Sequence, residues 1–417
     1  MEKKEIDIKI KELRRKYPDV HSIGYGRKRK NGEFTGELGL VFSVGKKKNI
    51  EELTEEELIP NTIELDNENF ITDVIEESGM KVLACDSTTQ NQCLYMLDSE
   101  FWNPTIISNR TTIRPLKGGV SMVRTSKKGS GVGTLGFLAV DKETGGLVAI
   151  SNLHVTNTVG LIATEYNLPG APGNRSYSTL QEQVYQTGEP NANITEAENI
   201  GRVKNYVPIY FLENGGYNTV DAAAIVLKES IISFDESYKI EGLTYPNPME
   251  FATTQEIDSI LVDDIPLYSS GRSTGPKEDQ PCGLVATQLN ASSRVDGYGI
   301  WRSGFTAEID FYDCIRFERY NSDCPSPIIG GDSGSVLIGN FNGVSKIIGL
   351  CFAGSTYSGL ACRIDRVADQ LNIEAWDGSD IPFLTESPQV HYEPGLTNDL
   401  TKVINGETYY QVGVSNT

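Results

Sequence analysis

Residues 327–339 read "PIIGGDSGSVLIG", in which two glycines and Asp-Ser-Gly-Ser separate two apolar runs. Gly, Asp and Ser are common turn residues, so a polar turn between two strands is one interpretation of this stretch. The other interpretation is a serine nucleophile, Ser333, on a loop whose glycines free the backbone N–H groups to bind an oxyanion. The stretch alone does not separate the two interpretations, and the rest of the chain has to decide.

A serine nucleophile needs a base that takes its proton and an acid that orients the base. The sequence has three histidines, His21, His154 and His391. His154 follows two apolar runs in "GTLGFLAVDKETGGLVAISNLHV", a pattern that predicts a β-hairpin ending at the imidazole. We interpret His21, at the start of a predicted strand, and His391, near the C-terminus, as structural or solvated. His154 is therefore the candidate base, although a lone histidine at a strand end is more often structural.

Asp221 is the candidate orienting acid, because it is a single carboxylate in the small apolar run "NTVDAAAIVL". A carboxylate in such a run is tolerated when it has a partner, whereas a solvent-facing Asp at a strand edge is the alternative. The chain order is then His154, Asp221, Ser333. This order is that of the chymotrypsin arrangement and differs from those of subtilisin and the α/β-hydrolases.

Short apolar runs separated by turn residues begin at about Lys117, and this pattern predicts all-β barrels or a sandwich. Residues 1–80 predict a small α+β module with a helix that ends at Pro18, a hairpin at Asn31-Gly32, a short acidic helix before Pro60 and one or two further strands. Residues 81–115 are interpreted as a connector and residues 377–417 as a C-terminal tail. Between the connector and the tail, the stretch "RIDRVADQLNI" predicts a helix that closes the domain.

The composition is that of a globular protein with two or three cores: 417 residues, 38% hydrophobic and 23% charged. A formal charge of −20 argues against nucleic acid as a partner. No window reaches the roughly 18 apolar residues of a membrane span, and the N-terminus lacks the apolar core of a secretory signal, so we expect a cytoplasmic protein without membrane contact.

Seven cysteines without a CxxC pair predict free thiols in a reducing compartment, with a Cys351–Cys362 disulfide as the alternative. The dispersed histidines and cysteines match no ligand spacing, so we expect neither a metal site nor a cofactor.

The segments "SNLHV", "VDAAAI" and "GGDSGS" resemble the three catalytic motifs of the trypsin-like serine peptidases, and "SSGRSTG" is similar to a turn of their bacterial members. With the N-terminal module included, the chain resembles the family of the plant narrow-leaf regulator and its bacterial relatives. The resemblance implies a mainly β protein with two six-stranded antiparallel β-barrels of the chymotrypsin type and a small N-terminal α+β domain. The peptidase domain would span residues 116–376, with the first barrel at about 116–232 and the second at about 240–376.

The resemblance also implies roles for individual residues. Ser333 would be the nucleophile, His154 the general acid and base, and Asp221 the orienter, with an oxyanion hole formed by the N–H groups of Gly331 and Ser333. Asp332 and Gly334 would support the active-site loop, and Phe352, Ala353 and Gly354 would bind the substrate backbone. Asp332 would hold the loop through a charge partner that the sequence does not identify. The segment "SPII" before Gly330 offers no acid, so we expect a small or apolar residue, not Arg or Lys, at the cleavage position.

Three functions share this site. The first is an active cytoplasmic serine endopeptidase that acts on protein or peptide substrates and is regulated by its N-terminal module, its tail, homo-oligomer assembly or a partner protein. The second is a catalytically silent or latent regulatory protein on a peptidase scaffold, and the third is an esterase with the same triad. The intact Ser, His and Asp set favours the endopeptidase.

Overall fold

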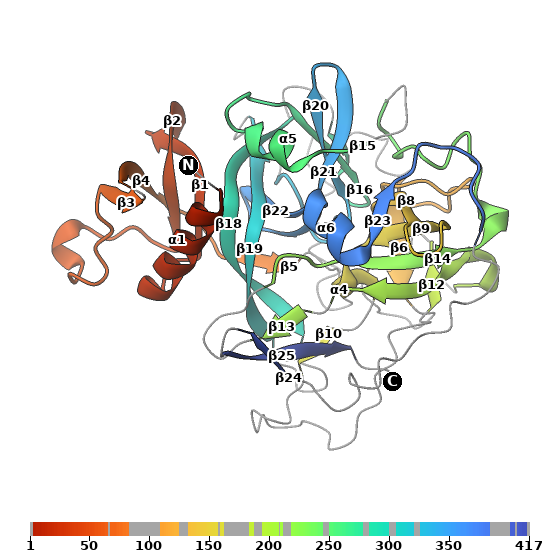
Figure 1. Cartoon of the computed structure of the whole chain (residues 1–417), viewed down its shortest axis with the longest axis horizontal. Helices are drawn as coiled ribbons and strands as arrows, with labels where there is room; N and C mark the ends of the chain where they lie inside the picture. Colours follow the sequence, from red (N-terminus) through yellow and green to blue (C-terminus); the bar gives the residue numbers. More distant parts are fainter. Residues whose placement is uncertain are drawn as a thin grey trace.

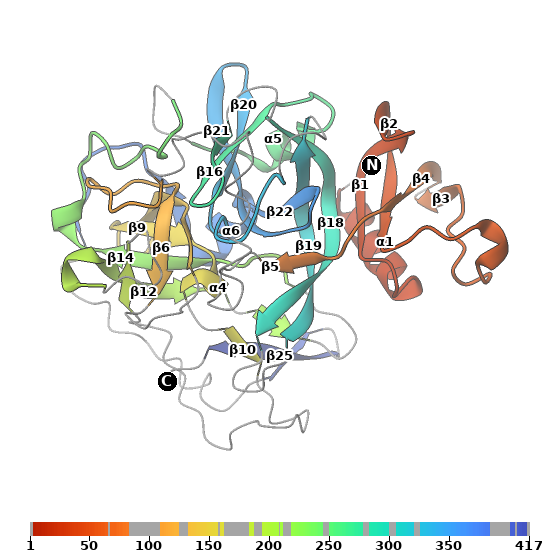
Figure 2. The same ribbon diagram turned by 180° about the vertical axis from the view of Figure 1, so that it is seen from behind.

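The computed structural model describes residues 3–65, 67–82, 109–124, 132–156, 159–161, 183–186, 194–207, 209–211, 218–244, 250–277, 283–299, 306–320, 326–383, 401–404 and 407–414. The architecture is mainly β, as predicted (Figure 1). Residues 3–76 form a module at one end of the molecule, and two strand-rich bodies follow it. The view from behind shows the same three parts, with the module now on the right (Figure 2).

The first barrel closes around six antiparallel strands within the described residues. They are β6 (Val120–Arg124), β7 (Val132–Leu135) continued by β8 (Phe137–Asp141), β9 (Leu147–Ser151), β11 (Gln183–Tyr185), β12 (Asn199–Tyr206) and β14 (Ala223–Leu227). Gly136 interrupts the β7–β8 strand, so that β7 pairs with β6 while β8 pairs with β9. A Cβ atom at Gly136 would lie 2.5 Å from the carbonyl oxygen of Gly334, so this bend has no room for a side chain. The bend closes the sheet and leaves no free edge.

The second barrel, also counted over the described residues, has six antiparallel strands. They are β16 (Leu267–Gly271), β18 (Leu284–Gly299), β19 (Thr306–Arg319), β20 (Val336–Phe341), β21 (Val344–Gly354) and β22 (Ser358–Arg363). The ring closes where Leu267 of β16 lies opposite Leu284 of β18. The short strand β17 (Gly275–Lys277) forms a hairpin with β16. The two closed sheets confirm the predicted fold class.

The C-terminal helix α6 (Ile364–Leu371) connects the two barrels. It buries Ile364, Val367 and Leu371, whose spacing of three and four residues places them on one face. The helix ends at Asn372, which has a left-handed backbone (φ 55°), and β23 (Ile373–Ala375) then pairs with β8 of the first barrel. The helix predicted for "RIDRVADQLNI" thus forms and returns the chain to the first barrel.

The N-terminal module consists of α1 (Lys3–Lys16), β1 (Ser22–Lys30), β2 (Glu33–Val44), β3 (Thr62–Leu65) and β4 (Glu68–Glu76). Its β1–β2 hairpin turns at Asn31 and Gly32, which both have positive φ (55° and 86°), the backbone of a type I′ turn. The acidic stretch before Pro60 was expected to be helical, but it forms a single 3-10 turn, η1 (Ile50–Glu52). This turn buries no residue, so no packing stabilises a longer helix there.

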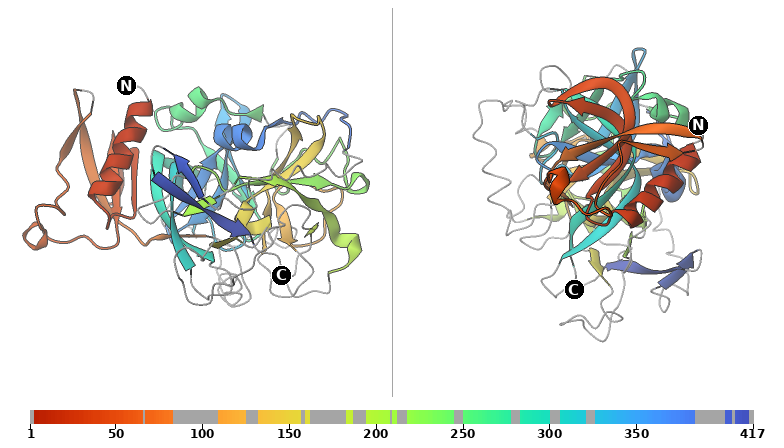
Figure 3. Two further views of the ribbon diagram at one scale, coloured as in Figure 1. Left: turned by 60° about the horizontal axis from the view of Figure 1, so that its bottom comes forward. Right: turned by 90° about the vertical axis from the view of Figure 1, so that its left-hand side faces the viewer.

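The module is joined to the second barrel by one continuous sheet. Strand β1 pairs with β18, with Ser22 opposite Ser293 and Gly26 opposite Gln288. A buried ion pair between Arg14 Nη2 and Asp310 Oδ1 (3.1 Å) connects α1 to β19. The end-on view of Figure 3 shows the module in front of the barrels, and its other view shows α1 facing them. The module is therefore an extension of the barrel sheet and shares its β18 strand.

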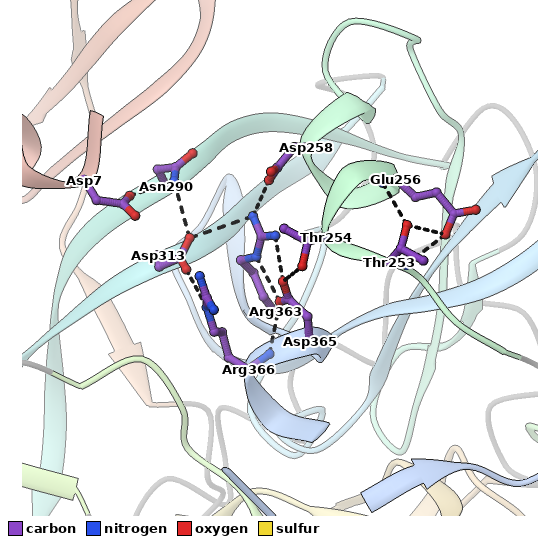
Figure 4. Close-up of polar contacts among 10 residues, drawn as sticks. All are labelled: Asp7, Thr253, Thr254, Glu256, Asp258, Asn290, Asp313, Arg363, Asp365 and Arg366. Atoms are coloured by element: carbon purple, nitrogen blue, oxygen red, sulfur yellow. Dashed lines mark hydrogen bonds and ion pairs between the residues drawn. The ribbon is translucent and has the colours of Figure 1, made fainter. Parts of the chain in front are cut away.

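A network of charges lies where the module meets the second barrel (Figure 4). The Asn290 amide donates to Asp7 Oδ1 of α1 at 2.7 Å and to Asp313 Oδ1 at 3.4 Å. The Asp313 carboxylate also binds Arg366 at 2.9 Å, and Arg363 lies 3.8 Å away. Fully buried Arg363 in turn binds Asp258 and Asp365, and this chain of pairs extends from the module to α6.

The remaining described elements lie around these bodies. They are β5 (Met80–Val82), α4 (Leu153–Thr156), η3 (Glu196–Glu198), η4 (Glu229–Ile231), β15 (Glu250–Phe251), α5 (Thr254–Ser259) and the sheet of β10 (Val159–Leu161), β13 (Ile209–Phe211), β24 (Thr401–Ile404) and β25 (Glu407–Val414). Near Tyr238, Ile240 makes an isolated bridge to Gly118. Among the described helices, none combines the length and apolar character needed to cross a membrane.

Candidate active site

His154 is carried by α4, a single helical turn directly after β9. The turn forms because the Asn152 carbonyl accepts hydrogen bonds from the N–H groups of Val155 and Thr156. Leu153 packs into the core that the two barrels share, and Val155 packs into the interior of the first barrel. These two anchors hold the imidazole at the junction of the barrels.

Asp221 is fully buried just before β14 and faces His154. Its Oδ2 lies 2.5 Å from His154 Nδ1, and its Oδ1 accepts from the His154 backbone N–H at 3.3 Å. The Asn152 amide donates to the Asp221 carbonyl at 2.7 Å, which connects α4 to the same segment. The carboxylate therefore has the partner that the sequence requires of a buried acid, and it holds His154 through both its ring and its backbone N–H.

The second barrel contributes two further contacts to Asp221. Tyr298 of β18 donates its hydroxyl proton to Asp221 Oδ2 at 2.6 Å, and the Asp221 N–H lies 3.2 Å from the Cys362 sulfur of β22. Burial, together with the negative charge of Asp221, raises the pKa of Tyr298 well above its ordinary value. Tyr298 therefore stays a donor to the carboxylate over the whole neutral range.

Ser333 lies on the loop before β20, and both barrels hold this loop. Thr134 of β7 donates its N–H to the Ser333 carbonyl (2.7 Å) and its hydroxyl to the Gly331 carbonyl (2.8 Å). Gly334 has a left-handed backbone (φ 93°), and a Cβ atom there would lie 2.0 Å from the Thr134 carbonyl oxygen and 2.4 Å from the Ser151 hydroxyl. Only glycine fits this position, and the loop therefore lies against the end of β9 that leads to His154.

The hydroxyl of Ser333 donates to the carbonyl of Phe352 at 3.1 Å. His154 Nε2 is buried and has no hydrogen-bond partner among the described residues. The structure thus brings His154 and Asp221 into contact and places Ser333 on the neighbouring loop without a bond to the imidazole. Ser333 is fully buried and His154 is 8% exposed, so the site is closed to solvent in this conformation.

The backbone around Ser333 offers donors for an anion. Among the described residues, the N–H groups of Gly331 and Ser333 have no hydrogen-bond acceptor. The N–H groups of Asp332, Gly334 and Ser335, in contrast, all donate to backbone carbonyls. The two free N–H groups are those predicted to form the oxyanion hole.

Asp332 is held by backbone N–H groups. Its Oδ1 accepts from Ser273 (2.8 Å) and Thr274 (3.0 Å) in the "SSGRSTG" turn, and its Oδ2 accepts from Ile329 (3.1 Å). The hydrogen-bond partners are thus neutral backbone N–H groups, in place of the charge partner expected from the sequence. The positive charge of Lys277 also acts on Asp332. Burial lowers the pKa of Lys277 to about 8 although the charge of Asp332 opposes this shift, and its Nζ has no hydrogen-bond partner within the described residues.

The three predicted substrate-binding residues, Phe352, Ala353 and Gly354, are buried at the end of β21. His21 lies just before β1, apart from the site, and His391 lies outside the described residues. Within these residues, Cys314, Cys351 and Cys362 are free thiols, so Cys351 and Cys362 are not joined. No group of three His, Cys, Asp or Glu residues in the described part of the chain is arranged to hold a metal ion.

Sequence reasoning missed Tyr298, Asn152 and Thr134. Asn152 stands inside the quoted "SNLHV" motif, so its position next to His154 was the available signal. Tyr298 is one of 19 tyrosines and lies 77 residues from Asp221. Because only the folding of β18 brings it there, no local pattern marks it.

No protein-family model matches the chain, and no curated protein is significantly similar to it. Among solved structures, it is similar to Nocardiopsis protease NAPase (14% identity, TM-score 0.32, covering 62% of this chain and 98% of that one). Protease A of Thermobifida fusca (10%, 0.32, 63% and 98%) and the chymotrypsin of Cellulomonas bogoriensis (13%, 0.30, 63% and 98%) are also similar. At these TM-scores, the fold assignment rests on the strand pairings described above. The resemblance to the plant regulator family stays a prediction.

Proposed function

We propose that the protein is a serine endopeptidase that cleaves peptide bonds through an acyl-enzyme. The observation that carries this proposal is the 2.5 Å contact between Asp221 Oδ2 and His154 Nδ1, while Nε2 has no hydrogen-bond partner in the described part of the chain. A carboxylate on Nδ1 selects the tautomer in which Nε2 is the acceptor that a general base needs. The N–H groups of Gly331 and Ser333, which have no acceptor among the described residues, would supply the second requirement, donors for a developing oxyanion.

In the proposed reaction, the Ser333 hydroxyl leaves the Phe352 carbonyl and turns toward His154 Nε2. Its oxygen attacks the carbonyl carbon of the substrate while Nε2 takes the proton, and the N–H groups of Gly331 and Ser333 bind the resulting oxyanion. His154 then gives this proton to the leaving amine, and the C–N bond breaks to form the acyl-enzyme. Water, deprotonated by His154, hydrolyses the ester and regenerates Ser333.

The proposal extends to specificity and location. Residues 326–329 contain no acid, which supports a small or apolar residue at the cleavage position. A peptide-library profile tests this, and dominant cleavage after Arg or Lys would contradict it.

The free buried thiols support a reducing compartment and hence the cytoplasm. The quoted motifs support kinship with the narrow-leaf regulator family and its bacterial members.

A latent protein on the same scaffold is the second candidate function. It is favoured by one observation, the buried Ser333 hydroxyl that donates to Phe352 and not to His154. Turnover of peptides as well as small activated esters would separate the endopeptidase from both the latent scaffold and an esterase.

Labelling with a fluorophosphonate probe tests the proposed function. The wild type should be labelled, whereas Ser333→Ala and His154→Ala should not, and Asp221→Asn should slow labelling by orders of magnitude, up to about 10⁴-fold. Ser335→Ala, two residues further along the same loop, is the matched control and should keep its labelling. Labelling that persists in Ser333→Ala would show that another residue is the nucleophile.

A further inference from the structure

The strand β5 follows the N-terminal module by three residues and runs onto the second barrel. It lies between two barrel strands (Figures 1 and 2). On one side it is parallel to β18, with Met80 opposite Val295 and Lys81 opposite Asp296. On the other side it is antiparallel to the end of β21, with Lys81 opposite Gly354 and Val82 opposite Ala353. The module therefore sends a strand of its own into the second barrel.

The edge that β5 covers leads directly to the candidate nucleophile. Ser333 donates to the carbonyl of Phe352, the residue that precedes Ala353 in β21. Along β5, the pairing moves from Gly354 to Ala353 and so toward Ser333. A peptide that adds to this edge as an antiparallel strand, with the bond to be cut at Ser333, runs in the same direction. Because a strand edge pairs with one strand at a time, β5 and such a peptide exclude each other.

A buried carboxylate holds β5 in this position. Glu77, three residues before Met80, is 6% exposed. It accepts hydrogen bonds from the Ser355 hydroxyl (2.6 Å), the Ser358 hydroxyl and the Arg316 guanidinium. Ser355 directly follows the predicted substrate-binding residues, so Glu77 is bound at the end of the same strand edge. A buried pair of this kind is strongly weakened when one partner is removed.

The side chains of β5 add apolar contacts. Met80 is 2% exposed within the main core, and Val82 packs against the same core. Lys81 of the same strand is exposed, so β5 alternates between buried and exposed side chains as a peptide bound across a barrel surface does.

We propose that β5 occupies the substrate-backbone site of the protein and restrains its activity. The inference rests on the proposed peptidase function and adds its regulation: extended peptides gain access only when residues 77–82 leave the edge of β21. Small esters, which do not need this edge, are restrained less. The alternative is that β5 is a permanent structural strand of the barrel. The following test distinguishes the two roles.

The variants Glu77→Gln and Val82→Pro weaken β5 in two different ways. The first keeps the shape of Glu77 and removes its charge, and the second removes a backbone N–H and disfavours strand pairing. Glu76→Gln is the matched control, because Glu76 is the exposed neighbour and undergoes the same chemical change. The substrates are chromogenic tetrapeptide amides with small or apolar residues at the cleavage position, and p-nitrophenyl acetate as a small ester.

For the tetrapeptides, kcat/KM should rise about tenfold or more in both variants, since the competent fraction of the protein increases. Hydrolysis of the ester should change by less than about twofold, on the same reasoning. The control should match the wild type on both substrates. Equal tetrapeptide kcat/KM in all four proteins, with Ser333 labelled in each, would overturn the proposal for β5 and leave the peptidase function intact. A Ser333 that reacts in none of them would overturn the proposed function itself.

Amide hydrogen exchange tests the same inference in the wild type, without a variant that has to fold. Residues 80–82 should be protected in the free protein. They should lose this protection once a tetrapeptide phosphonate is bound to Ser333. Unchanged protection in the fully modified protein would show that β5 is a permanent structural strand.

Discussion

The hydroxyl of Tyr298 and the imidazole of His154 bind the same oxygen of Asp221, at 2.6 Å and 2.5 Å. Tyr298 comes from the second barrel, whereas His154 and Asp221 come from the first. The Asp221 carboxylate, proposed to orient His154, is therefore positioned by both barrels, and any shift between the barrels changes its contacts.

Replacing Tyr298 with Phe should remove one donor from this buried carboxylate. We expect the free energy of unfolding to fall by about 1.5–3 kcal/mol, the contribution of a hydrogen bond to a charged group. Fluorophosphonate labelling should slow as well, because Asp221 is less firmly held. Urea unfolding measures the first effect, with Tyr357→Phe as the control, since Tyr357 is 63% exposed. Equal losses in the two variants would argue against a role for the Tyr298 contact.

The same variant has a signature in pH. Because the pKa of Tyr298 is raised in the folded protein, the unfolded chain loses this proton first on alkaline titration. The stabilising contribution of Tyr298 is thus complete below pH 10 and declines above it. The difference in unfolding free energy between the wild type and Tyr298→Phe should shrink above pH 10. A difference that grew there would contradict the assignment.

Gly334→Ala should disrupt the Ser333 loop. Its Cβ would overlap the Thr134 carbonyl oxygen, so we expect a loss of more than about 4 kcal/mol in stability. Gly343→Ala is the matched control: its φ of 89° is similar, but no atom lies within 4 Å of its Cβ position. It should cost only the backbone strain, about 1–2 kcal/mol. Thermal unfolding of both variants separates steric overlap from strain.

Asp332→Asn should loosen the backbone that we propose binds the oxyanion. The carboxylate accepts three backbone N–H bonds, and an amide can keep its oxygen on Ser273 and Thr274 only by turning an NH₂ group toward the Ile329 N–H. Two donors then face each other, so labelling of Ser333 should drop strongly while the strand content measured by circular dichroism stays unchanged. Labelling at the wild-type rate would show that the loop does not depend on Asp332.

Lys277→Met tests the buried cation near Asp332. The pKa of Lys277 falls from 10.5 to about 8 on folding, so the cost of burying its charge is complete below pH 8 and disappears as the pH rises to 10.5. Across this window, the stability of the wild type should increase relative to the variant by about 3 kcal/mol. Urea unfolding at several pH values measures the difference. A difference in unfolding free energy that stays constant from pH 7 to 10.5 would mean that folding does not lower the pKa of Lys277.

Asp365→Asn tests the corresponding effect on stability at acid pH. Burial alone would raise the pKa of Asp365, but the hydrogen bonds and charge of Arg363 lower it to about 2 (Figure 4). Its stabilising contribution is present above pH 3.8 and is lost as the pH falls through 2. The wild type should therefore lose more stability than the variant between pH 4 and 2. Asp369→Asn, on the exposed side of α6, should behave as the wild type.

Much of the fold could be predicted because its signals are local. The spacing of Ile364, Val367 and Leu371 predicts α6, and Asn31-Gly32 predicts the β1–β2 turn. The acidic stretch before Pro60 shows the limit of such signals, because helix-forming residues without a buried face did not extend beyond η1. A helix of this length depends on packing, which a local pattern does not contain.

The sequence by itself determined which side chains could do the chemistry. With three histidines and one "GGDSGS" stretch, the candidates His154, Asp221 and Ser333 and their order follow from the chain alone. Only the tertiary structure decided that Tyr298 binds Asp221, that backbone N–H groups hold Asp332, and that β5 covers the edge of β21. Apart from the Ile329 N–H bond to Asp332, these contacts join residues 58 to 273 positions apart, which barrel closure and the β1–β18 sheet bring together. Their partners are selected by shape and burial in three dimensions, and sequence spacing carries no record of that selection.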